Sequence, residues 1–286
     1  MQIDFSNAER AEVLHQALPY IKRYVGRIVV IKYGGNAMIN EALKEQVMGD
    51  MVLLHLIGVK VVLVHGGGPE ISDLMARLGK KAEFVDGLRV TDKETVDIVQ
   101  MVLSGKVNKT LVNLLESRGG HAIGLSGMDG SLIEAAVKDP RLGYVGRVTK
   151  VNIKPVTDIL ENGYIPVIST VGCDKAGNAY NINGDTAAAF IAGALGAERL
   201  IMMTDIDGIL RDKEDSSSLI PEMTTEEVAK LTEGGVISGG MIPKVECCLE
   251  ALREGVKNVV ILDGRVPHSI LMELLTDEGA GTWIHN

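Results

Sequence analysis

The amino-acid sequence predicts an α/β protein with an open, mostly parallel sheet sandwiched by helices and an extra N-terminal helix. Short β-branched runs alternate along the chain with stretches of about ten or more residues whose apolar side chains follow helical spacing. Several of the short runs end in consecutive glycines, as expected where a strand turns into a helix. With 286 residues, 46% of them hydrophobic, the chain can form one large domain or two lobes.

Composition excludes several classes of protein. A formal net charge of −9 argues against a general nucleic-acid-binding protein, which needs a positive surface. The sequence contains no apolar run long enough for a membrane span and does not begin like a secretory signal, so we expect a cytoplasmic protein without membrane contact. Three cysteines, with Cys247 and Cys248 adjacent, favour buried thiols over disulfides or a zinc site, and no metal site made by the protein alone is expected.

The first half of the chain begins with a helix expected over residues 6–24, opened by the capping box Ser6–Glu9. This helix has an apolar face and precedes the first strand, so either its own domain or another subunit would have to cover it. A second capping box, Thr91–Glu94, is expected to open a helix that runs to Gly105. The remaining elements are strands at 28–32, 60–65 and 122–126 and helices at 41–57, 69–78 and 106–118.

The second half opens with two antiparallel strands, expected at 134–137 and 144–151, and contains a hairpin within 172–183. The α/β alternation otherwise continues, with helices at 155–162, 185–195, 224–232, 244–254 and 268–275 and strands at 165–169, 200–204, 258–262 and 281–284. A soft boundary near residue 172 divides the chain into an N-terminal helix (1–25), an N-terminal lobe (26–172) and a C-terminal lobe (173–286).

Candidate ligand sites lie where expected strands end, since ligands of open parallel sheets bind beyond the carboxyl ends of the strands. One strand runs into Lys32-Tyr33-Gly34-Gly35-Asn36 and another into His65-Gly66-Gly67-Gly68-Pro69. Consecutive glycines let backbone N–H groups approach and hold an anion. A tight turn would explain one such pair, but two on neighbouring strands favour anion binding. Neither matches a P-loop or a dinucleotide fingerprint.

Charged residues beside these glycines are the candidates for chemistry. Lys32 ends an expected strand beside Gly34-Gly35, and Lys244 follows the pair Gly239-Gly240. An ammonium group at either place would attract an anion. Asp185 either only caps a helix or acts in the site. Arg89 either clamps a carboxylate or forms a surface pair. A structural role is favoured for His65, and the Asp205–Gly208 turn either orients charged groups or is an ordinary Asx turn.

Five motifs occur in an order that resembles the amino acid kinase family, and within it the enzymes that act on N-acetyl-L-glutamate. The resemblance covers the chain from about Leu14 to Ile284, and the motifs are specific in combination. They are Ile31-Lys32-Tyr33-Gly34-Gly35-Asn36-Ala37-Met38, His65-Gly66-Gly67-Gly68-Pro69, Asn181-Ile182-Asn183-Gly184-Asp185, Thr204-Asp205-Ile206-Asp207-Gly208 and Gly239-Gly240-Met241-Ile242-Pro243-Lys244-Val245. One departure is Gly184, where the family usually has alanine.

The resemblance implies a role for each matching residue. Backbone N–H groups of Gly67 and Gly68 would bind the substrate's side-chain carboxylate, and Arg89, Asn181 and Asn183 would complete the substrate site. Lys32 and Lys244 would stabilise the transferring phosphoryl group, with Asp185 holding both lysines. The nucleotide would contact the ends of the first and later strands and a further loop, namely Gly34, Gly35, Thr204, Asp205, Asp207, Gly208, Ile209, Leu210, Val236, Ile237 and Ser238.

The implied activity is ATP-dependent phosphorylation of the γ-carboxylate of N-acetyl-L-glutamate, a step of arginine biosynthesis, with Mg²⁺ held mainly by phosphates and water. Such a carboxylate has a pKa of about 4.3 and is already an ionised nucleophile, so no general base is needed. Alternatives are another kinase of the family acting on a different carboxylate, carbamate or UMP, a catalytically silent amino-acid sensor, and a nicotinamide-dependent oxidoreductase.

The resemblance also implies regulation. A helix before the first strand is similar to that of arginine-inhibited members, in which such helices join dimers into a hexameric ring. Tyr20, His268, Glu273 and Gly279 match positions associated with an arginine effector site. We therefore expect a hexamer that binds L-arginine. A P-II-type signalling protein is a further partner that the sequence leaves open.

Overall fold

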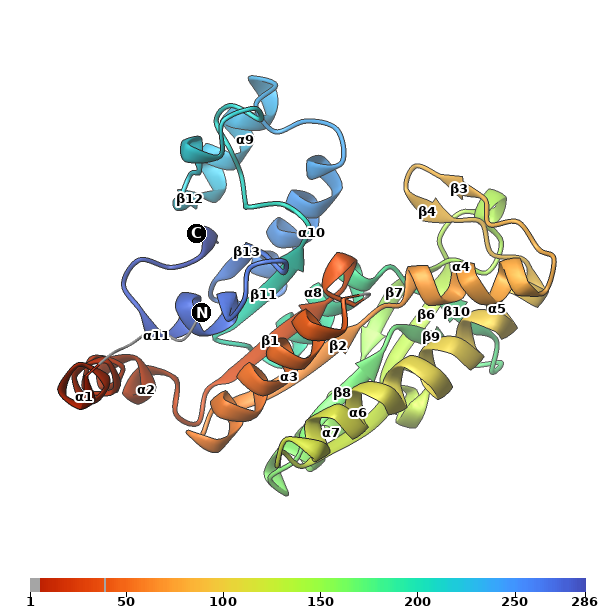
Figure 1. Ribbon diagram of the computed structural model, residues 1–286. Helices are drawn as coiled ribbons and strands as arrows, with labels where there is room; N and C mark the ends of the chain where they lie inside the picture. The colour runs from red at the N-terminus through yellow and green to blue at the C-terminus, as the bar shows by residue number, and fades with distance from the viewer. Residues whose placement is uncertain (1–5, 39) are drawn as a thin grey trace.

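The protein is built around an eight-stranded sheet with helices on both faces (Figure 1). The computed structural model describes residues 6–38 and 40–286. Neighbouring strands are parallel except β13 and β14, so the predicted open, mostly parallel sheet is confirmed. In spatial order the strands are β12 (Glu222–Thr224), β14 (Gly281–His285), β13 (Val259–Asp263), β11 (Arg199–Thr204), β1 (Ile28–Tyr33), β2 (Lys60–His65), β8 (Ile165–Ser169) and β5 (Ala122–Ser126).

Both faces of the sheet are covered, which explains the nearly continuous apolar runs of its strands. Alternate residues of β1 enter different cores: Val29 and Ile31 pack on one face, and Val30 packs on the other. The first face is covered by α3 (Glu41–Leu56), α4 (Gly68–Arg77), α5 (Lys93–Gln100), α6 (Asn108–Ser117) and α11 (Ser269–Leu275). The second is covered by α7 (Lys154–Glu161), α8 (Gly184–Ala194), α9 (Thr225–Glu233) and α10 (Met241–Arg253).

Two smaller sheets extend this core. One has the order β10-β9-β6-β7 and contains the antiparallel pair and the hairpin that the sequence predicts. Its strands are β6 (Ile133–Val137), β7 (Gly146–Val151), β9 (Val171–Cys173) and β10 (Ala179–Asn181). The other is a hairpin of β3 (Phe84–Val85) and β4 (Leu88–Arg89), which projects beyond α4 in Figure 1. This hairpin and β12 were not expected, because two- and three-residue strands leave no periodic pattern.

Helix boundaries differ from the predictions in two places. Asp92, not Thr91, caps α5 by accepting a hydrogen bond from Thr95 N at 2.8 Å, while the buried Thr91 hydroxyl donates to the Arg89 carbonyl at 2.7 Å. The expected break at Gly105 is also absent, since a π-helical segment, Met101–Val107, joins α5 to α6 without interruption. Glycine is tolerated inside a helix whose apolar face is buried, as Val102 and Leu103 are here.

The N-terminal segment forms two helices in place of the single helix expected over 6–24. Ser6 and Glu9 form the predicted capping box of α1 (Asn7–Gln16), and Pro19, which has no N–H to donate, lies in the first turn of α2 (Leu18–Tyr24). None of the residues of α1 is buried, and Leu14 is 73% exposed. The chain's own domain therefore leaves the apolar side chains of α1 uncovered. Figure 1 shows α1 at the edge of the molecule, next to α2.

Each helix that the structure describes is either too short or too polar to span a lipid bilayer.

Replacing the α5 cap tests the corrected helix start. Asp92→Ala removes the acceptor for Thr95 N and should lower the free energy of unfolding by about 1 kcal/mol. Asp92→Asn keeps an acceptor at the cap and loses only the exposed ion pair with Lys80, so it should cost less than about 0.5 kcal/mol. Urea unfolding of the two variants measures the difference, and equal losses would show that the cap contributes nothing.

Candidate active site

Three strands end side by side at one edge of the sheet, and each ends in a segment that the sequence analysis singled out. Tyr33 of β1 lies opposite His65 of β2, and Lys32 lies opposite Met202 of β11. The parallel register therefore places the segments that begin at Gly34, Gly66 and Asp205 at the same edge. Ligands of open parallel sheets bind at this position.

A carboxylate between two ammonium groups forms the charged centre of this edge. Asp185 Oδ1 lies 2.9 Å from Lys32 Nζ, and Asp185 Oδ2 lies 3.5 Å from Lys244 Nζ. Burial by itself would raise the pKa of Asp185, but the charges and hydrogen bonds of Lys32 and Lys244 outweigh it and hold the pKa below its ordinary value. The carboxylate is therefore ionised at neutral pH.

Helix α8 positions this carboxylate by packing close to its neighbours. Its buried face is made of alanines such as Ala188 and Ala192, whose small side chains let the helix lie near β1 and α10. A Cβ atom at Gly193 would collide with Glu254, so close approach also requires that glycine. Asn183, rather than Asp185, caps the helix by accepting from Thr186 N at 3.0 Å. Asp185 is thereby available to the lysines.

The glycines after β1 make room for charged side chains. A Cβ atom at Gly34 would lie 2.6 Å from Lys32 Nζ. Gly35 has a φ of +72°, and a Cβ atom there would collide with the Asp205 carboxylate. By contrast, a Cβ atom at Gly184 would meet Lys32 Cε at an ordinary 3.5 Å. The departure at Gly184 therefore does not disturb the charged centre.

A pocket of about 160 Å³ opens beside the triple glycine of β2 and contains the residues predicted to bind substrate. Arg89 Nη2 donates to Gly68 O at 3.0 Å and to Ser72 Oγ at 2.8 Å, and the guanidinium stacks on Phe84 at 4.8 Å. Burial lowers the pKa of Arg89 from its ordinary value, yet a guanidinium stays charged at neutral pH. The pocket is lined, among others, by Gly67, Gly68, Leu103, Asn181 and Asn183.

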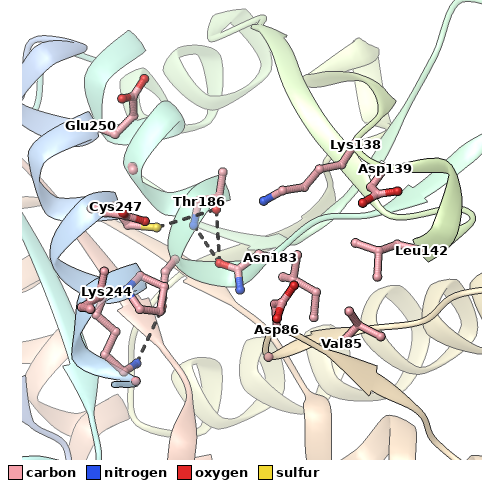
Figure 2. Close-up of a pocket in the computed structure, with 18 of the residues that line it drawn as sticks. Val85, Asp86, Lys138, Asp139, Leu142, Asn183, Thr186, Lys244, Cys247 and Glu250 are labelled. Atoms are coloured by element: carbon pink, nitrogen blue, oxygen red, sulfur yellow. Dashed lines mark hydrogen bonds and ion pairs between the residues drawn. The ribbon is translucent and has the colours of Figure 1, made fainter. Parts of the chain in front are cut away.

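A larger cleft, of about 1080 Å³, lies next to this pocket and shares Asn183 with it. Asp185 and Lys244 line the cleft, as do Lys138 and Cys247. Figure 2 shows the Lys138 side chain directed toward Asn183 and Thr186. Lys138, Phe84 and Ser72 could not be predicted from the sequence, because each comes from a segment without a distinctive motif.

The predicted nucleotide residues lie on a segment after β11. Thr204 is buried, Asp207 pairs with Arg265 at 3.1 Å, and Ile209 N donates to Thr282 Oγ1 at 2.8 Å. The side chains of Ile209 and Ile237 lie in the hydrophobic core, so only their backbone could contact a ligand. Gly208 is buried as well, whereas Leu210 and Val236 are half-buried. Lys213, absent from the prediction, donates to Ser238 Oγ.

The four residues predicted for an arginine effector lie around α11, near α2. Tyr20 makes a hydrogen bond with Asp277 that raises the pKa of the phenol. His268 Nδ1 lies 2.6 Å from Asp50 Oδ1. Glu273 is already paired with Arg199 at 2.6 Å and accepts from Ala280 N, while Gly279 lies next to the same carboxylate with a φ of +67°. These residues are grouped apart from the strand-end site.

Comparison with known proteins decides the family. A sequence model of the Amino acid kinase family matches residues 27–263. The chain belongs to the amino acid kinase family. Among curated members, an acetylglutamate kinase from Clostridium beijerinckii is 55% identical over 98% of this chain and 99% of that protein. One from Trichormus variabilis is 52% identical over 98% of this chain and 94% of that protein.

Solved structures also superpose on the chain. An N-acetylglutamate synthase from Neisseria gonorrhoeae, complexed with coenzyme A and N-acetyl-glutamate, matches with a TM-score of 0.83 at 26% identity. The match covers 96% of this chain and 63% of the synthase, so the synthase is a longer protein. A carbamate kinase from Giardia lamblia bound to AMP-PNP matches with a TM-score of 0.68 at 20% identity, over 91% of this chain and 99% of that one, which indicates a shared fold.

The acid dependence of stability tests the charged centre of this kinase. A carboxylate whose pKa is lowered by folding stabilises the protein above its unfolded pKa of about 3.9, and this contribution is lost as the pH falls through the lowered value. Asp185→Asn should therefore lower the unfolding free energy by about 2 kcal/mol or more at neutral pH, with the deficit shrinking below about pH 4. Urea unfolding between pH 2.5 and 7 measures the deficit.

Asp207→Asn is the matched control, because Asp207 forms an ion pair with the half-exposed Arg265. Its deficit should stay small at every pH. A deficit for Asp185→Asn that does not change with pH would contradict the assignment of a lowered pKa.

Proposed function

We propose that this chain transfers the γ-phosphoryl group of ATP to the γ-carboxylate of N-acetyl-L-glutamate, giving N-acetyl-L-glutamyl 5-phosphate in arginine biosynthesis. The observation that carries the proposal is the Lys32–Asp185–Lys244 cluster beside a pocket lined by glycine backbone and Arg89. Relatives named acetylglutamate kinase, 50–55% identical over nearly the whole chain, support the choice of substrate.

The chemistry needs placed charge and no general base. The acceptor carboxylate is ionised at neutral pH, so it can attack phosphorus without losing a proton first. Lys32 and Lys244 neutralise charge on the equatorial oxygens of the phosphoryl group as it moves in line from ATP to the acceptor. Asp185 stays ionised between them and fixes the directions of both ammonium groups.

The acceptor would be held by backbone N–H groups and polar side chains that line the smaller pocket. Backbone N–H groups of Gly67 and Gly68 bind the γ-carboxylate, and the Arg89 guanidinium with Asn181 binds the α-carboxylate end. Arg89 is fixed by Gly68 O, Ser72 Oγ, Met75 Sδ and the Phe84 ring. Asn183 lines the same pocket while capping α8.

ATP would lie against Gly34, Gly35 and the segments 204–210 and 236–238. In the part of the chain that the structure describes, no three carboxylate, histidine or cysteine groups lie together as a metal site. Mg²⁺ would be held mainly by nucleotide phosphates and water, because this ion usually takes few protein ligands. The ion would supply charge neutralisation on the phosphates, while the lysines act from the protein side.

The assembly and regulation follow the same family pattern. The lobes would be residues 26–172 for the acyl amino acid and 173–286 for ATP, with residues 1–25 for oligomerisation, in a cytoplasmic enzyme. The exposed Val13, Leu14 and Leu18 of the N-terminal helices supply apolar surface for a partner subunit of a hexamer built as a trimer of dimers. L-arginine would act near Tyr20, His268, Glu273 and Gly279. A P-II-type protein is a further partner to test.

A coupled ADP assay tests the substrate directly. With ATP and Mg²⁺, N-acetyl-L-glutamate should give turnover, because it matches the carboxylate pocket and its Arg89 anchor. Free glutamate, aspartate, carbamate and UMP serve as comparison acceptors and should give at least about tenfold lower kcat/KM. Turnover with one of them and none with N-acetyl-L-glutamate would assign a different acceptor.

Removing the N-terminal helices tests their proposed role in assembly. Sedimentation velocity should show a smaller oligomer for a chain that starts at Gly26 than for the full chain, because Val13, Leu14 and Leu18 are lost. The substitution Leu14→Glu in the full chain is a milder version that leaves the fold intact, since Leu14 is largely exposed. The same oligomeric state in all three proteins would rule out this role.

A further inference from the structure

We propose that His65 is a positioning residue of the phosphoryl-acceptor site, which orients the Gly66–Gly67 peptide so that the glycine N–H groups face the acceptor carboxylate. The inference deepens the proposed function and rests on it for the identity of the acceptor. His65 is the last residue of β2, and its side chain is fully buried behind the triple glycine. Its ring touches the backbone of the very next residue: Nδ1 lies 2.8 Å from Gly66 O.

The hydrogen-bond partners of His65 determine its tautomer. A carbonyl oxygen can only accept, so Nδ1 carries the proton and donates to Gly66 O. Nε2 is then a lone-pair acceptor for Asn108 Nδ2, which lies 3.1 Å away and shares its two hydrogens among this nitrogen and the carbonyls of Val167 and Leu125. Burial lowers the pKa of His65 to about 4, so the ring is neutral at pH 7 and holds this tautomer.

Asn108 is itself held in one orientation. Its Nδ2 lies 2.9 Å from Val167 O and 3.2 Å from Leu125 O, while its Oδ1 accepts from Lys109 Nζ at 3.0 Å. If the Asn108 amide were rotated by half a turn, its oxygen, which can only accept, would face the carbonyl oxygens of Val167 and Leu125. Gly124 of β5 is required as well, because a Cβ atom there would collide with Asn108 Oδ1. The network therefore ties His65, the last residue of β2, to β5 and β8.

Because a peptide group is planar, the hydrogen bond that fixes the Gly66 carbonyl also fixes the direction of the next N–H group. In a trans peptide the carbonyl and the following N–H point in opposite directions, so fixing Gly66 O toward His65 turns Gly67 N–H away from it. Gly67 O is fixed in the same way by Ile71 N at 3.0 Å, which sets Gly68 N–H. Gly68 O accepts from Arg89 Nη2, and the next residue, Pro69, has no N–H.

The two N–H groups set in this way are available to a ligand. Across residues 6–38 and 40–286, neither Gly67 N nor Gly68 N has an acceptor among the hydrogen bonds of the chain. Both glycines line the pocket of about 160 Å³ and stand at the N-terminus of α4, where the helix dipole favours an anion. A histidine that is neutral at pH 7 thus directs a pair of neutral donors toward a carboxylate.

Two amide substitutions separate this role from a merely structural one. Asn places its amide nitrogen close to the position of Nδ1, so His65→Asn keeps the bond to Gly66 O and loses the bond to Asn108. Asn108 Nδ2 then still has two carbonyls for its two hydrogens. Gln reaches the position of Nε2, so His65→Gln keeps the bond to Asn108 and loses the bond to Gly66 O. Val64→Ala, at a buried residue that packs in the core on the other face of the sheet, controls for lost core stability.

The experiment measures KM and kcat of the full-length enzyme for N-acetyl-L-glutamate and for ATP, with crystal structures of both His65 variants. We expect KM for N-acetyl-L-glutamate to rise at least about tenfold in His65→Gln, with KM for ATP and kcat within about threefold of wild type. His65→Asn and Val64→Ala should stay within about threefold of wild type in every constant. The Gly66–Gly67 peptide should rotate in His65→Gln and keep its orientation in His65→Asn.

Equal effects of the two amides, or an unrotated peptide in His65→Gln, would overturn the inference while leaving the proposed function intact. If the wild-type enzyme does not phosphorylate N-acetyl-L-glutamate, the proposed function fails instead. The crystal structures then still decide whether His65 orients the peptide, because that comparison needs no substrate.

Discussion

The pairing of one buried carboxylate with two ammonium groups is the interaction on which the rest of the site depends. Asp185 lies between Lys32 of β1 and Lys244 of α10, and it draws the two halves of the chain together at one point. The two ammonium groups and the one carboxylate of this cluster together carry a net charge of +1. A transferring phosphoryl group is an anion, so this surplus is available to it, while the carboxylate prevents the lysines from repelling each other.

The same interaction explains how an acidic protein can act on anions. The formal net charge is −9, so the long-range field does not attract ATP or an acyl glutamate. In the proposed site, attraction comes from a few fixed cations, Lys32, Lys244 and Arg89, and from backbone N–H groups at the glycines. The glycines also make room for charged side chains, because they have no Cβ atom. A Cβ atom at Gly34 would occupy the space of Lys32, and one at Gly35 would occupy the space of Asp205.

Most of the fold and the residues of the charged centre could be predicted from the sequence, for identifiable reasons. Strands such as β1 and β2 are long and β-branched, and their parallel register brings their glycine-rich ends together. Lys32, Asp185 and Lys244 lie in motifs with a recognisable order. What could not be predicted depends on contacts distant in sequence, such as the stacking of Phe84 on Arg89 and the hydrogen bond of Asn108 to His65. The start of α5 was predicted one residue too early, because two neighbouring side chains could cap the helix. Asp92 forms the cap that Thr91 was expected to provide.

A double-mutant cycle on the two lysines tests the central claim most directly. The kcat values of wild type, Lys32→Ala, Lys244→Ala and the double variant would be measured with N-acetyl-L-glutamate and saturating ATP. If one carboxylate couples both lysines to the same phosphoryl group, each single variant should lose at least about a hundredfold in kcat, and the double variant should lose far less than the product of the two losses. Losses that multiply within about twofold would mean that the lysines act independently, which would contradict the account.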